Sequence, residues 1–210
     1  MEFTHRLHLT TRILVTFLAL AVPGTGTAVA ADAPHTTLPI QPPGMVAYER
    51  TMVEWAYGLF TEAGLILPAV RISFHTDAEP CEGNMGTLRH GDDGTRVLRV
   101  CADHDKPTVR DRWRRKTLVH ELAHAWEQTS LDDATRGNFA DLRGLGNWND
   151  RSGPWHERAT EHAAEVVTWA LLDFSSGFAA LPDHGCDQFR QAYRALTGDA
   201  PLNGLTNSCS

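Results

Sequence analysis

Apolar residues recur at helical spacing in four parts of the chain, and each part predicts a helix. Residues 45–64 carry apolar side chains along one face, and Gly64 is a natural C-cap for that helix. Two long helices are predicted over 108–130 and 154–174, and a short one over 187–196. The second half of the chain is therefore predicted to be mainly helical.

Alternating apolar and polar residues predict three strands between the first two helices. Residues 68–76 alternate and are rich in β-forming residues, while 86–90 and 95–102 flank the turn sequence GDDG and predict a hairpin. Residues 131–149 are rich in glycine, aspartate and asparagine, and they are predicted to be irregular. This order of elements predicts an α+β fold, in which a small, mostly antiparallel sheet packs on helices.

The N-terminal segment has the composition of an export signal. Residues 1–30 combine a basic start, an apolar run over 13–22 and small residues before an expected cleavage after Ala30. The apolar run is shorter than the ~20 residues that a membrane-spanning helix needs. We therefore expect a secreted protein with no membrane anchor after cleavage, a proline-rich leader over 31–44 and one folded domain over 45–210.

Charge and cysteine content indicate which classes of partner and which redox environment to expect. The formal net charge of −7 argues against nucleic acid or an anionic membrane as the main partner. The four cysteines form no CxxC pair, so an exported chain favours disulfides over a thiolate metal site. Of the three pairings that are open, we prefer Cys81–Cys101 and Cys186–Cys209, although the sequence alone does not decide the connectivity.

The stretch TLVHELAHAWEQTS contains the pattern HExxH, formed by His120, Glu121 and His124. Residues four apart lie on one helix face with Cβ atoms ~5–6 Å apart, so both imidazoles can reach one zinc ion. Glu121 flanks that position, where a carboxylate can take a proton from water. The alternative is an amphipathic helix with two surface histidines, but the neighbouring residues are mostly apolar and would solvate free histidines poorly.

A catalytic zinc site needs a third protein ligand and an open position. In the elongated metzincin pattern a glycine and a third histidine follow the motif, whereas this chain has Glu127 and Ser130 there. The other common solution is a glutamate on a following helix. The predicted helix after residue 154 offers Glu157, Glu161 and Glu165, whose spacing of four predicts one shared face.

The second set of residues resembles the gluzincin branch of the HExxH metallopeptidases. The sequence EHAAE matches the second motif of that branch through Glu161, Ala164 and Glu165. The resemblance implies a zincin-like fold, Glu161 as the third zinc ligand, and Glu165 as the acceptor of a hydrogen bond from a ligating histidine. The sequence ERATE, with Glu157 and Thr160, fits one turn earlier and stays open as an alternative.

The resemblance implies a peptidase that acts on proteins or peptides with one Zn²⁺ per chain. The ion lowers the pKa of water, and Glu121 acts as the general base. Arg151, His156 and Tyr193 are the candidates for stabilising the transition state. The strand expected over 86–90 is the candidate for pairing with an extended substrate. We expect a monomer. The alternative is a secreted zinc-binding interaction domain without catalytic activity.

Overall fold

The computed structural model describes most of the chain beyond residue 38. The described residues are 39–40, 44–102, 104–146, 148, 153–172 and 185–201. They all belong to one compact unit, Pro34–Ser210. The predicted signal peptide, most of the predicted leader, Arg151 and Cys209 lie outside the described residues. Within the described ranges, no helix has the length and apolar character needed to cross a membrane.

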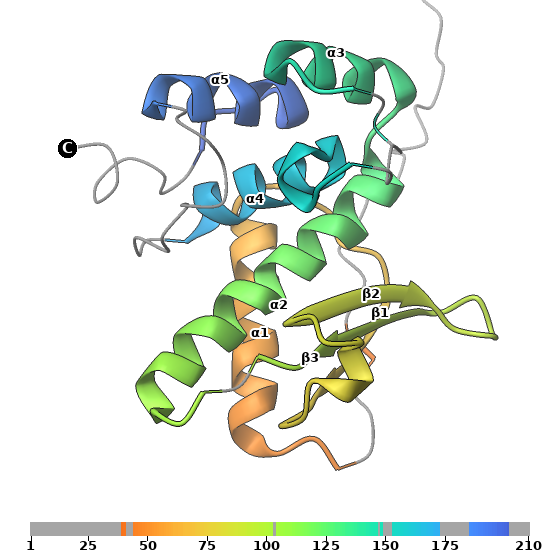
Figure 1. Ribbon diagram of the computed structural model, residues 1–210, viewed down its shortest axis with the longest axis vertical. Helices are drawn as coiled ribbons and strands as arrows, with labels where there is room; N and C mark the ends of the chain where they lie inside the picture. Colours follow the sequence, from red (N-terminus) through yellow and green to blue (C-terminus); the bar gives the residue numbers. More distant parts are fainter. Residues whose placement is uncertain are drawn as a thin grey trace, which may run out of the picture. The chain divides into compact units, whose positions relative to one another are not determined.

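The fold is α+β, as the sequence predicts (Figure 1). In chain order the elements are α1 Ala47–Glu62, β1 Val70–Phe74, the 3₁₀ helix η1 Glu79–Cys81, β2 Gly86–His90, β3 Arg96–Val100, α2 Pro107–Ser130, α3 Asp133–Arg143, the 3₁₀ helix η2 Trp155–Glu157, α4 Ala159–Leu171 and α5 Cys186–Thr197. The predicted first helix, hairpin, histidine helix and last helix correspond to α1, β2–β3, α2 and α5 with small differences at their ends.

The sheet is mixed, which corrects the expectation of a mostly antiparallel sheet. The strand order is β1-β3-β2. β2 and β3 form the predicted antiparallel hairpin, with Gly86 opposite Val100. The second strand of that hairpin, β3, lies next to β1 and runs parallel to it, with Val70 opposite Arg96. A hairpin that docks through its second strand produces this arrangement, and it leaves β2 at an outer edge of the described sheet.

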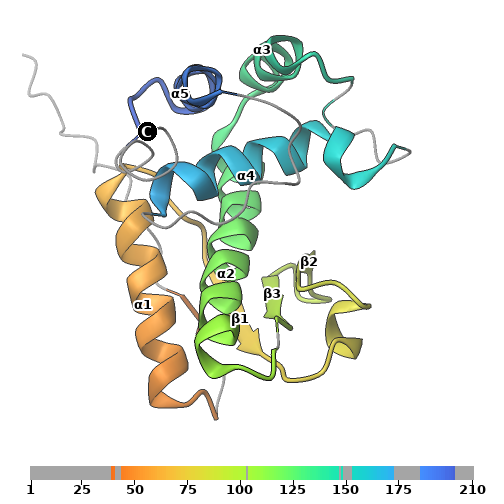
Figure 2. The same cartoon turned by 60° about the vertical axis from the view of Figure 1, so that its left-hand side comes forward.

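Helix α2 lies at the centre of the described fold. It packs against α1, α4, β2 and β3, and Figure 2 shows it between α1 and the sheet, with α4 crossing its upper part. Its side chains Leu118, Leu122 and Ala125 are fully buried in the main hydrophobic cluster. Burial of a leucine side chain contributes about 1.5–3 kcal/mol to folding. The apolar residues around the histidines of α2 are therefore core residues, so the helix carrying the motif is held firmly.

Residues 131–149 are not irregular as predicted, because α3 forms within them. Asp132 is its N-cap, and its side chain accepts a hydrogen bond from the Thr135 amide at 2.7 Å. Gly144 ends the helix in the left-handed conformation at φ 64°. Phe139 is fully buried, and α3 packs against α4 and α5. The polar residues and glycine that suggested a loop thus include the caps of a short amphipathic helix.

The predicted helix over 154–174 divides into η2 and α4. Arg158 adopts an extended conformation (φ −86°, ψ 127°) between them. The carbonyl oxygen of His156, which a continuous helix would use in its backbone ladder, accepts a hydrogen bond from His162 Nε2 at 2.6 Å. Glu157 therefore lies on η2, and the expectation that it shares one helix face with Glu161 and Glu165 is wrong.

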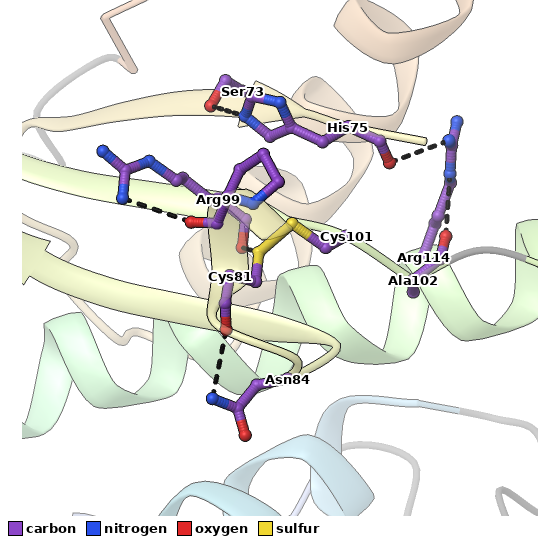
Figure 3. The surroundings of a disulfide bond; sticks show 9 residues. Ser73, His75, Cys81, Asn84, Arg99, Cys101, Ala102 and Arg114 are labelled. Carbon is purple, nitrogen blue, oxygen red and sulfur yellow. Dashed lines mark hydrogen bonds between the residues drawn. A yellow bond between two sulfur atoms is a disulfide. The ribbon is translucent and has the colours of Figure 1, made fainter. Parts of the chain in front are cut away.

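A disulfide joins Cys81 and Cys101, as predicted (Figure 3). Cys81 ends η1 and Cys101 directly follows β3, so the bond closes the base of the β2–β3 hairpin. Its closed loop has a sequence separation of 20, and a loop of that size contributes roughly 3 kcal/mol to stability. Cys186 is also disulfide-bonded. The predicted partner Cys209 is outside the described residues.

The buried guanidinium of Arg114 ties α2 to the sheet beside this disulfide. Its Nε donates to the carbonyl oxygen of Ala102 at 3.1 Å, and its Nη2 donates to that of His75 at 3.4 Å. Figure 3 shows these bonds next to Cys101. The helix that carries the motif is thus held to the residues that follow β1 and β3 by polar contacts as well as by apolar packing.

Candidate metal centre

Three side chains from α2 and α4 converge on one point. His120 and His124 project from one face of α2, and Nε2 of each ring lies 3.2 Å from Oε2 of Glu161 on α4. The candidate ligand atoms of these three residues all lie within 4.8 Å of one another and could hold a metal ion. Two imidazole nitrogens and one carboxylate oxygen form a donor set that zinc accepts, and they leave a coordination position open.

The structure distinguishes between the two glutamates that the sequence leaves open. Glu161 lies at both histidines, whereas the side chain of Glu157 is 61% exposed on η2, with Oε1 3.8 Å from His156 Nε2. Glu161 lies in the first turn of α4, after the break at Arg158, so two glutamates one turn apart in the sequence lie on different elements. Glu161, and not Glu157, therefore completes the three-residue cluster.

The outer nitrogen of His120 faces the second glutamate of α4. Its Nδ1 lies 3.2 Å from Glu165 Oε1, at ion-pair distance but without the alignment of a hydrogen bond. Lys116 Nζ lies 3.2 Å from the same oxygen. Glu165 thus lies beside His120, as the resemblance implied. Its carboxylate also pairs with Lys116, which lies one turn before His120 on α2.

The outer nitrogen of His124 faces a glutamate that sequence reasoning did not assign to the site. His124 Nδ1 is 2.7 Å from Oε1 of Glu127, whose side chain is 3% exposed. In the sequence this residue served only to exclude the metzincin pattern. Its position three residues after His124, on a helix that is apolar around the motif, was the signal that could have identified it.

The carboxylates and imidazoles of the cluster strongly perturb one another. Burial opposes protonation of His120, but its contacts with the carboxylates of Glu161 and Glu165 outweigh burial and raise its pKa to about 9. Burial likewise opposes protonation of His124, yet Glu127 and Glu161 raise its pKa well above the usual range. Burial raises the pKa of Glu161, but the two histidines outweigh it and lower that pKa overall. The glutamates thus favour the protonated, positively charged forms of His120 and His124.

Glu121 lies on the side of α2 that faces β2. Its side chain is buried, and burial raises the pKa of the carboxyl above its usual value. A Cβ atom built on Gly86, the first residue of β2, would be 2.8 Å from Glu121 Oε1 and 2.4 Å from Thr117 Cγ2. The strand backbone therefore approaches the motif helix more closely than any side chain at position 86 would allow.

We expect Gly86→Ala to destabilise the protein by about 1–3 kcal/mol, because the added methyl group overpacks this contact. The matched control is Gly58→Ala on α1, where a Cβ meets nothing within 4 Å. That change replaces glycine inside a helix and should raise stability by about 0.5–1 kcal/mol. Urea unfolding measures both. A Gly86→Ala variant as stable as the parent protein would contradict the close approach.

The short helix η2 forms one border of the site. The Trp155 ring lies 6.1 Å from the His120 ring at an interplanar angle of 30°, and Trp155 is 37% exposed. The buried His162 holds this segment through the His156 carbonyl, and Arg143 Nη2 lies 3.4 Å from His162 Nδ1. Trp155 was not predicted as a site residue, because its position beside His120 depends on the break before α4.

The three candidates for transition-state stabilisation have different outcomes. His156 lies exposed on η2, next to Trp155. Tyr193 is 1% exposed on α5, and both views show α4 between α5 and α2 (Figures 1 and 2). Burial raises the pKa of Tyr193 to about 12. The structure therefore does not bring Tyr193 to the histidines. Arg151 is outside the described residues.

Comparisons of the chain with protein-family models, with curated proteins and with solved structures find no match.

Proposed function

We propose that this protein is a secreted zinc-dependent peptidase, in which His120, His124 and Glu161 hold the ion. The observation that carries the proposal is the approach of both histidine Nε2 atoms to one oxygen of Glu161 at 3.2 Å. The outer nitrogens of both rings face buried glutamates, an arrangement typical of ligating histidines. A bound zinc ion supplies a Lewis acid that polarises a carbonyl group and makes water more acidic.

The proposed role of Glu121 is that of general base. It neighbours His120 in sequence, and the raised pKa of its buried carboxyl suits a group that accepts a proton and returns it. Glu121 takes a proton from the attacking water and then donates it to the amine that leaves when the peptide bond breaks. Its place on the same rigid helix as both histidines keeps its carboxylate close to the reacting water.

A peptide is the proposed substrate because of the outer strand beside the site. β2 pairs with β3 on one side and is at an edge of the described sheet. Its first residue, Gly86, lies against Glu121. An extended peptide that adds to the outer edge of a sheet forms main-chain hydrogen bonds independent of its sequence. A substrate peptide that pairs with β2 in this way would place one of its peptide bonds near Glu121, the proposed base.

The zinc-binding domain without activity is the second candidate, and the composition of the site disfavours it. Structural zinc sites commonly use four protein ligands, often cysteines. The group found among the described residues has three donors and no cysteine. A purely structural site would also leave the buried carboxylate of Glu121 beside the histidines without a role.

Metal removal tests the proposal. The purified protein should contain about one zinc ion per chain and should cleave a denatured protein substrate. Dialysis against a strong chelator should abolish cleavage because the Lewis acid is lost, and stoichiometric zinc should restore it. The assays are metal analysis and the release of new amino termini. Zinc at full occupancy without cleavage across a broad peptide library would favour the binding domain, and the absence of bound zinc would contradict both candidates.

A further inference from the structure

Each histidine of the cluster has a glutamate on its outer side, but the two glutamates come from different places. Glu165 reaches His120 from the facing helix α4, whereas Glu127 reaches His124 from α2 itself. The His124–Glu127 contact is a hydrogen bond of 2.7 Å, and the His120–Glu165 contact is 3.2 Å and is not aligned for a hydrogen bond. His124 therefore has the closer glutamate, and that glutamate lies on the same helix.

The two glutamates also differ in the cations that surround them. Oε1 of Glu165 lies 3.2 Å from Lys116 Nζ as well as from His120. For Glu127, His124 is the ion-pair partner found among the described side chains, and the Glu127 Oε2 atom has no hydrogen-bond partner there. The charge of Glu127 therefore acts mainly on one imidazole ring. Burial of a carboxylate is costly unless it is paired, so its near-complete burial indicates that the histidine contact is what retains it.

We propose that Glu127 is the positioning residue that makes His124 a ligand through Nε2. Its carboxylate accepts the Nδ1–H hydrogen bond, which keeps the lone pair on Nε2 and fixes the plane of the ring toward His120 and Glu161. Because Glu127 and His124 are three residues apart on one helix, this orientation is set within α2. The inference rests on the proposed function only in requiring that the cluster binds zinc. It does not require catalysis.

Zinc affinity of Glu127 variants tests this role. Glu127→Leu should weaken zinc binding by about 10–100-fold, the usual effect of losing an outer partner of a ligating histidine. Glu127→Gln keeps an acceptor of similar shape without the charge, and it should weaken binding by about fivefold. The matched control is Gln128→Leu, at the adjacent exposed position on α2, which should bind zinc as the wild type does. Competition with a chromophoric chelator measures all four proteins.

Two further readouts separate positioning from a general packing role. The visible spectrum of the Co²⁺-substituted protein reports ligand geometry, and it should change in Glu127→Leu but not in Gln128→Leu. The melting temperature of the metal-free variants measures stability separately: Glu127→Gln should melt somewhat lower, because it removes the charged partner of His124, but it should stay folded at the temperature of the zinc titration. If Glu127→Leu does not fold, the Gln variant carries the test alone.

Zinc affinity within twofold of the wild type, together with an unchanged Co²⁺ spectrum, in every folded Glu127 variant would overturn the inference and leave the proposed function intact. A lower melting temperature of metal-free Glu127→Gln at unchanged affinity would show that Glu127 only stabilises the fold. A wild-type protein that binds no zinc would overturn the proposed function and the inference together.

Discussion

Glu121→Gln is expected to keep its zinc and to lose peptide hydrolysis by about 10²–10⁴-fold, the usual contribution of a general acid–base group. Glutamine has the size of glutamate but cannot accept the proton of the attacking water. The amide should fit the buried position between α2 and β2, so the fold should be retained. Steady-state cleavage rates measure the loss, and metal analysis of the same preparation shows whether zinc is still bound.

The control for this change is Glu157→Gln, at an exposed glutamate on η2. It removes the same charge near the site without touching His120 or His124, and it should keep most of the activity. An active Glu121→Gln variant would exclude Glu121 as the base. A variant that loses both zinc and activity would instead place Glu121 among the groups that hold the ion.

Glu161→Ala is expected to weaken zinc binding by more than about 100-fold, because removal of a direct ligand costs more than removal of an outer partner. Alanine also removes the carboxylate that lies between His120 and His124. Chelator competition measures the affinity, and the control is Glu157→Ala, which should bind zinc as the wild type does. The opposite result for these two variants would place the third ligand one turn earlier in the sequence.

Local spacing was sufficient to predict the part of the site that lies on one helix. His120, Glu121 and His124 lie on α2 as their separation requires, and this depends only on the geometry of a helix. Glu161 could be predicted as the third candidate ligand because a glutamate on a following helix commonly completes an HExxH zinc site. The Cys81–Cys101 disulfide was predicted because its cysteines flank a recognisable hairpin, and the structure confirms it.

The features that sequence reasoning missed depend on contacts between distant residues. Parallel pairing of β1 with β3 depends on where the hairpin docks, which no local pattern reports. The break before α4 is accompanied by a hydrogen bond between His162 and the His156 carbonyl, and Trp155 lies beside His120 on the segment before the break. Glu127 was missed for another reason: a buried and an exposed glutamate look identical in sequence until the packing around the helix is known.

Because the three candidate ligands lie on two helices, the proposed metal binding would also protect the chain against proteolysis. His120 and His124 belong to α2 and Glu161 belongs to α4, so an ion held by all three would act as a reversible cross-link between the two helices. Free zinc at 100 times its dissociation constant would add about 2.7 kcal/mol to the stability of the folded state. A molecule of the proposed peptidase that loses its ion would therefore lose its activity and unfold more readily, so that the remaining active molecules could degrade the inactive ones.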